Sequence, residues 1–338
     1  MPEGELKPEE EQEPEKPERT SGLMRVAGAS LEEEQTVLKD IEKEVFNNQE
    51  ILELEREKTP EELEIIGGIL AHLPEFVKKY GGKPAPLRPE HIHTIDYNQL
   101  SAERKEKLEG VRGKFHSPTQ SATVFVDKEE ENTLSFAFLT THELLHFSAF
   151  QSVDIHTNSE KNVISDRVGG FIRIKNGKEA YFADIDEAVT EELLIRLDDS
   201  YFKSLGPLSG ELAQREESRS RLAKKHPEID PDEVKRKIAN HTTVQLKNGP
   251  KAGMWRSRIE GYKYSEEREK LKKIINDIQE KNPQRFKSSE AVFDVFARAY
   301  FTGETLEIGR LIEGTYGKGS FRRLGEETKA KAKKPSNS

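Results

Sequence analysis

The 338-residue sequence contains no cysteine. Disulfides, thiolate metal sites and cysteine nucleophiles are therefore excluded, and any metal centre must use His, Asp or Glu side chains. The sequence also lacks an apolar run that approaches eighteen residues, so we expect no membrane-spanning helix. Residues 1–5 show neither the basic nor the apolar part of a secretory signal, and we expect a cytoplasmic protein.

Apolar residues are few, at 33%, against 35% charged residues. Part of this polarity lies in residues 1–20, whose eight Glu and three Lys or Arg carry −5 of the formal net charge of −9. Such a segment cannot bury enough apolar surface to offset its ordering entropy, so we predict a disordered acidic tail. The remainder is mildly acidic without a basic patch, which argues against a nucleic-acid partner.

Residues 141–147 read Thr-His-Glu-Leu-Leu-His-Phe and place His142 and His146 four positions apart in an apolar run. On a helix these positions share a face, so both imidazoles can bind one metal ion. Glu143 then lies beside the ion, where its carboxylate can take a proton from an activated water. The motif predicts a zinc-dependent hydrolase, and the alternative is a chance match in a structural helical protein.

A third ligand is required to complete such a site. Asp154 and His156 follow the motif closely, but Glu187 begins a predicted helix and Glu191 lies one turn later on the same face. One carboxylate could bind the metal while the other accepts the free ring N–H of a ligand histidine, which raises the basicity of that ligand. We prefer Glu187 over the first two; the alternative is that both glutamates are solvated helix charges.

The motif His142-Glu143-x-x-His146, followed by a hairpin and by residues 186–191, Asp-Glu-Ala-Val-Thr-Glu, resembles the gluzincins, the zinc peptidases that include thermolysin. The resemblance covers about residues 120–200. It implies Zn²⁺ bound by the two histidines and Glu187, with Glu143 as general base and Glu191 orienting a ligand histidine.

The metzincin pattern is not met, because Ala149 and Ser152 stand where its Gly and third His would be. The gap from His146 to Glu187 is longer than in thermolysin, so the connecting region should differ.

We expect an α+β class, a mainly helical zincin-like fold with a small sheet and hairpin beside the active-site helix. That helix is predicted over residues 134–150 and the ligand helix over 184–197, with Asp184 or Asp186 as its N-cap. Strands are predicted at 122–126 and around the turn signal Asn176-Gly177, while 152–167 looks looser. Another alternating stretch, His91 to Ile95, is either a surface strand or the holder of a second metal site.

The flanks are predicted to be helical and charged. One helix is expected over 31–58 and a second after Thr59, broken or kinked at Gly67-Gly68 and Pro74; they form either a hairpin packed on the core or a coiled-coil arm. Toward the C-terminus we predict a turn or short hairpin at 245–253, helices at 209–225, after 231, and at 264–281, 289–301 and 306–313, and an end to the fold at 316–319.

These expectations divide the chain into regions. They are an acidic tail (1–28), an N-terminal helical region (29–120), a zincin catalytic core (121–205), a C-terminal helical subdomain (206–325) and a disordered basic tail (326–338).

The predicted activity is zinc-dependent peptide-bond hydrolysis by metal-activated water on a peptide or protein substrate. The alternative is a non-catalytic binding or regulatory protein on a zincin scaffold. We expect strand 122–126 to be an edge that holds an extended substrate. The hydrolysis also needs a hydrogen-bond donor for the oxyanion. The candidates are Tyr181, His241, Tyr262 and Tyr264.

Overall fold

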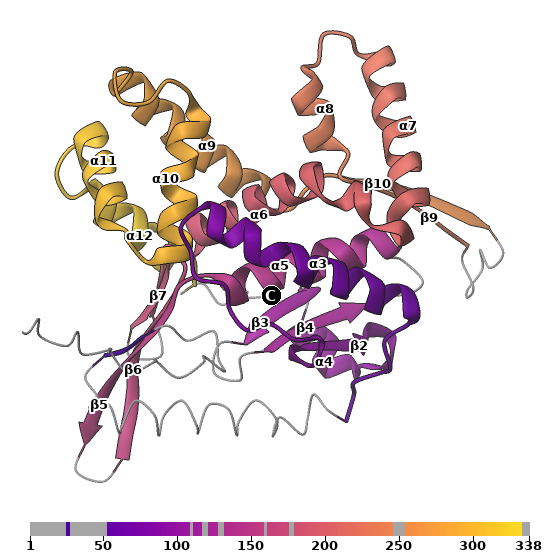
Figure 1. Cartoon of the computed structure of the whole chain (residues 1–338), viewed down its shortest axis with the longest axis horizontal. Coiled ribbons are helices and arrows are strands. Elements are labelled where there is room, and N and C mark those ends of the chain that lie inside the picture. Colours follow the sequence, from indigo (N-terminus) through magenta and orange to yellow (C-terminus); the bar gives the residue numbers. More distant parts are fainter. Residues whose placement is uncertain are drawn as a thin grey trace, which may run out of the picture.

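The computed structural model describes residues 25–27, 53–108, 111–116, 121–127, 132–158, 161–175, 179–245 and 254–332. In this part of the chain the fold is α+β and mainly helical, with three small sheets, which confirms the predicted class (Figure 1). Most of the acidic tail predicted over 1–28 and most of the helix predicted over 31–58 lie outside the described residues. Residues 25–27 of the tail form a strand that pairs with residues 152–154, so the prediction of disorder was wrong for this stretch. The described end of that helix was predicted wrongly, because residues 53–59 form a turn and Glu55 makes an isolated bridge to Ile95.

The sheet nearest the candidate site has the order β2-β4-β3. Strand β4 (Ser121–Val126) pairs in parallel with β2 (Ile92–Asp96) and antiparallel with β3 (Gly113–His116). The prediction that 122–126 is an edge strand was therefore wrong, because both sides of β4 are paired. Strand β3 forms the edge of this sheet that lies next to the helix with His142 and His146. Strand β2 is buried along most of its length, so it is not a surface strand.

The second sheet has the order β1-β5-β6-β7-β8. Its strands are β1 (Arg25–Ala27), β5 (Gln151–Asn158), β6 (Lys161–Gly169), β7 (Ile172–Lys175) and β8 (Glu179–Tyr181). Strands β5 and β6 form a long antiparallel pair, so the expectation of a loose segment at 152–167 was wrong. This stretch is rich in Asp and Asn, which are uncommon in strands. The antiparallel β7–β8 pair confirms the hairpin, while its Asn-Gly turn lies outside the described residues.

Helices α5 (Thr133–Ser148) and α6 (Ala183–Ser200) pack against each other in the middle of the molecule (Figure 1). The N-cap of α5 is Asn132, whose side chain accepts from the Ser135 N–H. The N-cap of α6 is Phe182 in the left-handed conformation, with φ of 60°, so the prediction of an aspartate cap was wrong. Asp186 instead accepts hydrogen bonds from the backbone N–H groups of the β6–β7 connection.

Helix α3 (Pro60–Lys79) begins with a capping box between Thr59 and Glu62 and has Pro60 in its first turn. It continues through Gly67, Gly68 and Pro74, so the predicted break is absent. Its buried face packs against α5, which supports packing on the core for this helix.

The C-terminal half contributes a two-stranded sheet and several helices. These are α7 (Ser209–Lys225), α8 (Pro231–Lys237), β9 (Asn240–Gln245), β10 (Trp255–Glu260), α9 (Ser265–Lys281), α10 (Ser289–Thr302), α11 (Leu306–Tyr316) and α12 (Ser320–Ala332). Short connecting helices are η1 (Pro89–His91), η2 (Tyr97–Gln99), α4 (Ala102–Lys107), η4 (Phe202–Ser204) and η5 (Gly206–Leu208).

The predicted end of the fold at 316–319 was wrong, because α12 follows it and continues into the expected basic tail as far as Ala332. Helix α12 contacts the start of α6. The rings of Phe182 and Phe321 lie 4.8 Å apart, and the Phe182 N–H donates to the Gly325 carbonyl at 3.4 Å. The last helix therefore holds the residue that opens α6.

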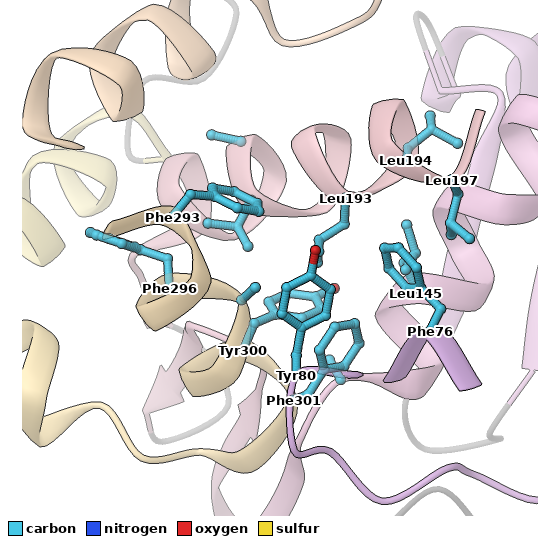
Figure 2. Packing of buried hydrophobic residues seen from close by; sticks show 14 of the residues in the cluster. Phe76, Tyr80, Leu145, Leu193, Leu194, Leu197, Phe293, Phe296, Tyr300 and Phe301 are labelled. Atoms are coloured by element: carbon cyan, nitrogen blue, oxygen red, sulfur yellow. The ribbon is translucent and has the colours of Figure 1, made fainter. Parts of the chain in front are cut away.

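One hydrophobic core joins the N-terminal, central and C-terminal parts of the described chain. Figure 2 shows Phe76 of α3 and Tyr80, which follows this helix, facing Tyr300 and Phe301 of α10, with Leu193 of α6 close by. The buried cluster extends from Ile65 to Leu324, so the three predicted regions between 29 and 325 share a core. Among the described residues, no helix combines the length and apolar character that crossing a membrane requires.

Candidate metal centre

The facing sides of α5 and α6 bring His142, His146 and Glu187 together. Nε2 of His142 lies 3.1 Å from Nε2 of His146 and 3.1 Å from Oε2 of Glu187, and the remaining distance, from His146 Nε2 to that oxygen, is 3.5 Å. Bonds of 2.0–2.2 Å around a tetrahedral metal ion would place its ligand atoms about 3.3–3.6 Å apart. The longest of the three distances lies in this range and the other two are slightly shorter, so the three side chains lie close enough together to share one metal ion.

The second ring nitrogen of each histidine faces a buried carboxylate. Nδ1 of His142 lies 3.1 Å from Oε2 of Glu191, and Nδ1 of His146 lies 3.3 Å from Oδ2 of Asp186. Carboxylates in these positions fix the tautomer in which Nε2 carries the free lone pair. The described site thus has two ring nitrogens and a carboxylate oxygen converging on one point, with an orienting carboxylate behind each ring.

The electrostatics of this point favour positive charge. Burial alone would lower the pKa of His142, but its hydrogen bonds to Glu187 and Glu191 outweigh this and raise the pKa to about 10. Burial would likewise lower the pKa of His146, yet Glu187 and Asp186 raise it well above 6.5. Burial would raise the pKa of Glu187, whereas the two histidines lower it well below 4.5. A metal cation at this point would meet the same attraction and compete with protons for the imidazoles.

Glu143 is almost completely buried, with 6% of its surface exposed. Burial raises the pKa of its carboxyl group, an effect that the charges of His142 and His146 partly offset. A carboxylate with a raised pKa next to a metal site is suited to accept a proton from water and release it again. Glu143 thus lies near both histidines, and its role as a base stays a prediction.

The backbone of strand β3 lies against the Glu143 carboxylate. The Phe115 N–H donates a hydrogen bond to it, and a Cβ atom added at Gly113 would collide with its Oε1. The Arg112 carbonyl accepts from the Phe125 N–H of β4. Because alternate residues of an antiparallel strand face opposite edges, Gly113 and Phe115 present their backbone groups away from β4, toward Glu143 and the edge that no described strand pairs with.

The other proposed metal ligands lie elsewhere. Asp154 is on β5 and is not part of the ligand group found among the described residues. The backbone of His156 lies on the same strand, opposite Val163, and its side chain is outside the described residues. His91 accepts from the Arg88 N–H, whereas Nδ1 of His93 pairs with Glu55 at 2.8 Å, so these histidines have separate partners and do not share a metal site.

The four residues considered as hydrogen-bond donors to the oxyanion lie in different parts of the structure. The Tyr181 hydroxyl donates to Glu179 on β8, and both ring nitrogens of His241 face serine hydroxyls, of Ser218 and Ser257. The Tyr262 hydroxyl donates to the buried Asp198 carboxylate. Of these four residues, Tyr264 is the one that contacts a candidate metal ligand, because its ring stacks on His142 with the centroids 5.6 Å apart.

Comparisons with models of protein families, with curated proteins and with solved structures found no match for this chain.

Several site residues were not assigned from the sequence. Asp186 was expected only as a helix cap, although it precedes Glu187 and orients His146. The Tyr300 hydroxyl lies 3.3 Å from the same His146 nitrogen, and Gly113 makes room for Glu143. The adjacency of Asp186 to the ligand was a usable signal, whereas Gly113 and Tyr300 come to the site from remote segments that carry no motif.

Proposed function

We propose that this protein is a zinc-dependent peptidase, with Zn²⁺ held by His142, His146 and Glu187. The observation that carries the proposal is the converging triangle of two Nε2 atoms and one carboxylate oxygen, with 3.1–3.5 Å edges. His and carboxylate donors with one open position are characteristic of hydrolytic zinc sites. The exposed fraction of the Glu187 side chain is 30%, against 11% for His142, so the site is open to a substrate on the Glu187 side.

The chemistry follows from the arrangement of these residues. Zinc bound here would polarise the substrate carbonyl and lower the pKa of water toward neutrality. Glu143 accepts a proton from the attacking water as the new C–O bond forms, and passes it to the leaving amide nitrogen, after which the C–N bond breaks. Asp186 and Glu191 hold the imidazoles through their Nδ1 atoms. We retain the cytoplasm as the proposed compartment.

A peptide substrate is supported by strand β3. Gly113 and Phe115 direct backbone groups to the open edge next to Glu143. An extended peptide can pair with such an edge through main-chain hydrogen bonds, which would carry its scissile bond past the base.

The test is the metal content and hydrolytic activity of the purified protein and of Glu143→Gln. We expect about one zinc per chain in both proteins, and hydrolysis of a peptide library by the wild type alone. Removal of the general base should reduce the rate by at least about 10²–10⁴-fold. Zinc with no hydrolysis by either protein would favour a binding or regulatory role, and a chain without stoichiometric metal would indicate a chance motif.

A further inference from the structure

We propose that the Tyr264 hydroxyl is the hydrogen-bond donor to the oxyanion of the hydrolysis, and that Tyr262 holds it in place through Asp198. This inference rests on the proposed function and assigns two further residues to it. Tyrosine donates a hydrogen bond and transfers no proton in this role, since the water proton goes to Glu143 and then to the leaving amine.

Tyr264 is on the open side of the site. Its ring lies parallel to His142, with an interplanar angle of 15°, and its hydroxyl is close enough to the Glu187 carboxylate to interact with its charge. The residue is 37% exposed, and the Glu187 side chain is 30% exposed. A substrate carbonyl that approaches the ion from solvent therefore passes the Tyr264 hydroxyl.

Tyr300 also approaches the ligands but cannot serve this role. Its side chain is fully buried, its hydroxyl accepts from Thr190, and it lies behind His146 at Nδ1. It therefore contacts the ligand on the side that faces the core, where a substrate does not reach.

The backbone at Tyr264 is held in an unusual conformation. Its φ angle of 52° is in the left-handed region, which a residue with a Cβ adopts only at a cost of roughly 1–2 kcal/mol. Such a conformation is maintained when the surrounding contacts determine it. The contacts around residues 262–264, between β10 and α9, identify what holds the ring over His142.

Two successive residues of this segment are hydrogen-bonded to carboxylates of α6, and the next residue interacts with a third carboxylate. The Tyr262 hydroxyl donates to Asp198, the Lys263 N–H donates to Oε1 of Glu191 at 2.7 Å, and the Tyr264 hydroxyl is close enough to Glu187 to interact with its charge. These carboxylates are four and seven positions apart, so they follow one face of the helix. Glu191 binds both His142 and the segment, which ties the ligand ring to the stacked tyrosine.

The Asp198 end of this row is fixed by a buried cation. Asp198 is 0% exposed, and Oδ2 accepts from Arg215 Nη1 at 2.6 Å as well as from Tyr262. Arg215 in turn donates to the Ala239 carbonyl, which precedes β9. Arg215 thus fixes Asp198, which binds Tyr262. Tyr264 follows two residues later, so the position of its ring depends on that of Tyr262.

The first experiment compares Tyr264→Phe with the wild type and with Tyr181→Phe as a matched control. We expect Tyr264→Phe to keep its zinc and its KM within about twofold while kcat falls about 10²–10³-fold. Affinity for a phosphinic peptide, a tetrahedral mimic of the transition state, should fall in parallel when measured by calorimetry. Tyr181→Phe should match the wild type in all of these.

The second experiment is a double-mutant cycle with Tyr262→Phe. A positioning role predicts a smaller loss of kcat in Tyr262→Phe at constant zinc content, and no further loss when it is added to Tyr264→Phe. A purely structural role predicts that Tyr262→Phe lowers kcat by the same factor in the wild type and in Tyr264→Phe. That result would overturn the assignment of Tyr262.

Full kcat and full phosphinic-peptide affinity in Tyr264→Phe would overturn the assignment of Tyr264 while leaving the proposed peptidase intact. Failure of the proposed function has a different signature. In that case the wild type contains no zinc, or shows no hydrolysis, or shows hydrolysis that Glu143→Gln retains. Any of these results would also overturn the assignment of both tyrosines.

Discussion

Nδ1 of His142 lies 3.1 Å from Oε2 of Glu191, a carboxylate with 2% exposure on the neighbouring helix. The other oxygen of this carboxylate accepts from the Lys263 backbone N–H. Each carboxylate oxygen therefore has one of these two donors, and the ring is held with Nε2 toward the proposed ion.

Replacement of Glu191 by glutamine should weaken zinc binding by about 10–100-fold. The amide can accept from only one of the two donors, so its NH₂ group must face either the ring N–H or the Lys263 N–H. Zinc affinity can be measured by competition with a chromophoric chelator. Asp199→Asn, an exposed position on the same helix, is the control and should bind zinc like the wild type.

Gly113→Ala should reduce hydrolysis without removing zinc. The added methyl group would occupy the space of the Glu143 carboxylate, which must then shift away from the Phe115 N–H and the attacking water. We expect kcat to fall at least tenfold, with metal content unchanged by atomic absorption. Gly67→Ala on α3 is a matched control, because a Cβ atom there has no neighbour within 4 Å and alanine favours a helix. Equal activity in the two variants would contradict this account of β3.

Arg215→Ala should destabilise the fold by about 3–5 kcal/mol, because it leaves the buried Asp198 carboxylate without its cation. The pair is almost entirely buried, at 1% and 0% side-chain exposure. Urea unfolding of the zinc-loaded protein measures the loss. Arg221→Ala breaks an ion pair with both side chains more than 60% exposed and should leave the midpoint nearly unchanged.

Glu192 should make the free energy of unfolding depend on pH in the acidic range. Burial alone would raise its pKa, but the charges of Arg268, Arg236 and Arg196 outweigh this and hold the pKa below its ordinary value of 4.5. Because the pKa of Glu192 is lower in the folded state, its ionised form stabilises the fold at pH values above the unfolded-state pKa. This contribution is lost as the pH falls through the folded-state pKa. The stability difference between the wild type and Glu192→Gln should therefore be full at pH 7 and should shrink below pH 4.5. A difference that is constant with pH would show that the charge of Glu192 is not involved.

The parts of the site that could be predicted from the sequence are those carried by helical spacing. His142 and His146 are one turn apart, as are Glu187 and Glu191, so each pair is fixed by local geometry. Their meeting depends on the contact between α5 and α6, for which the apolar faces and the intervening hairpin gave the indication. The tertiary placement of Tyr264 was not predictable, because it depends on Asp198 and Arg215, whose pairing no spacing rule reveals.

The errors in the fold have a common physical cause. Strands β5 and β6 carry many polar residues, and their pairing is a property of two segments together rather than of either propensity alone. Similarly, Phe182 opens α6 without a capping side chain, because contacts with Phe321 and Gly325 hold it there. In both cases tertiary contacts outweigh the local preference from which the prediction was made.

The contact between α12 and Phe182 has a consequence for proteolysis. Glu187 lies five residues after Phe182, whereas Phe321 and Gly325, which secure Phe182, lie far away in the sequence. A cut between α11 and α12 would leave His142, His146 and Glu187 in the chain but would release the contact that holds the start of α6. The proposed third ligand would then be held less firmly, so such a cut should weaken the proposed metal site without removing any residue from it.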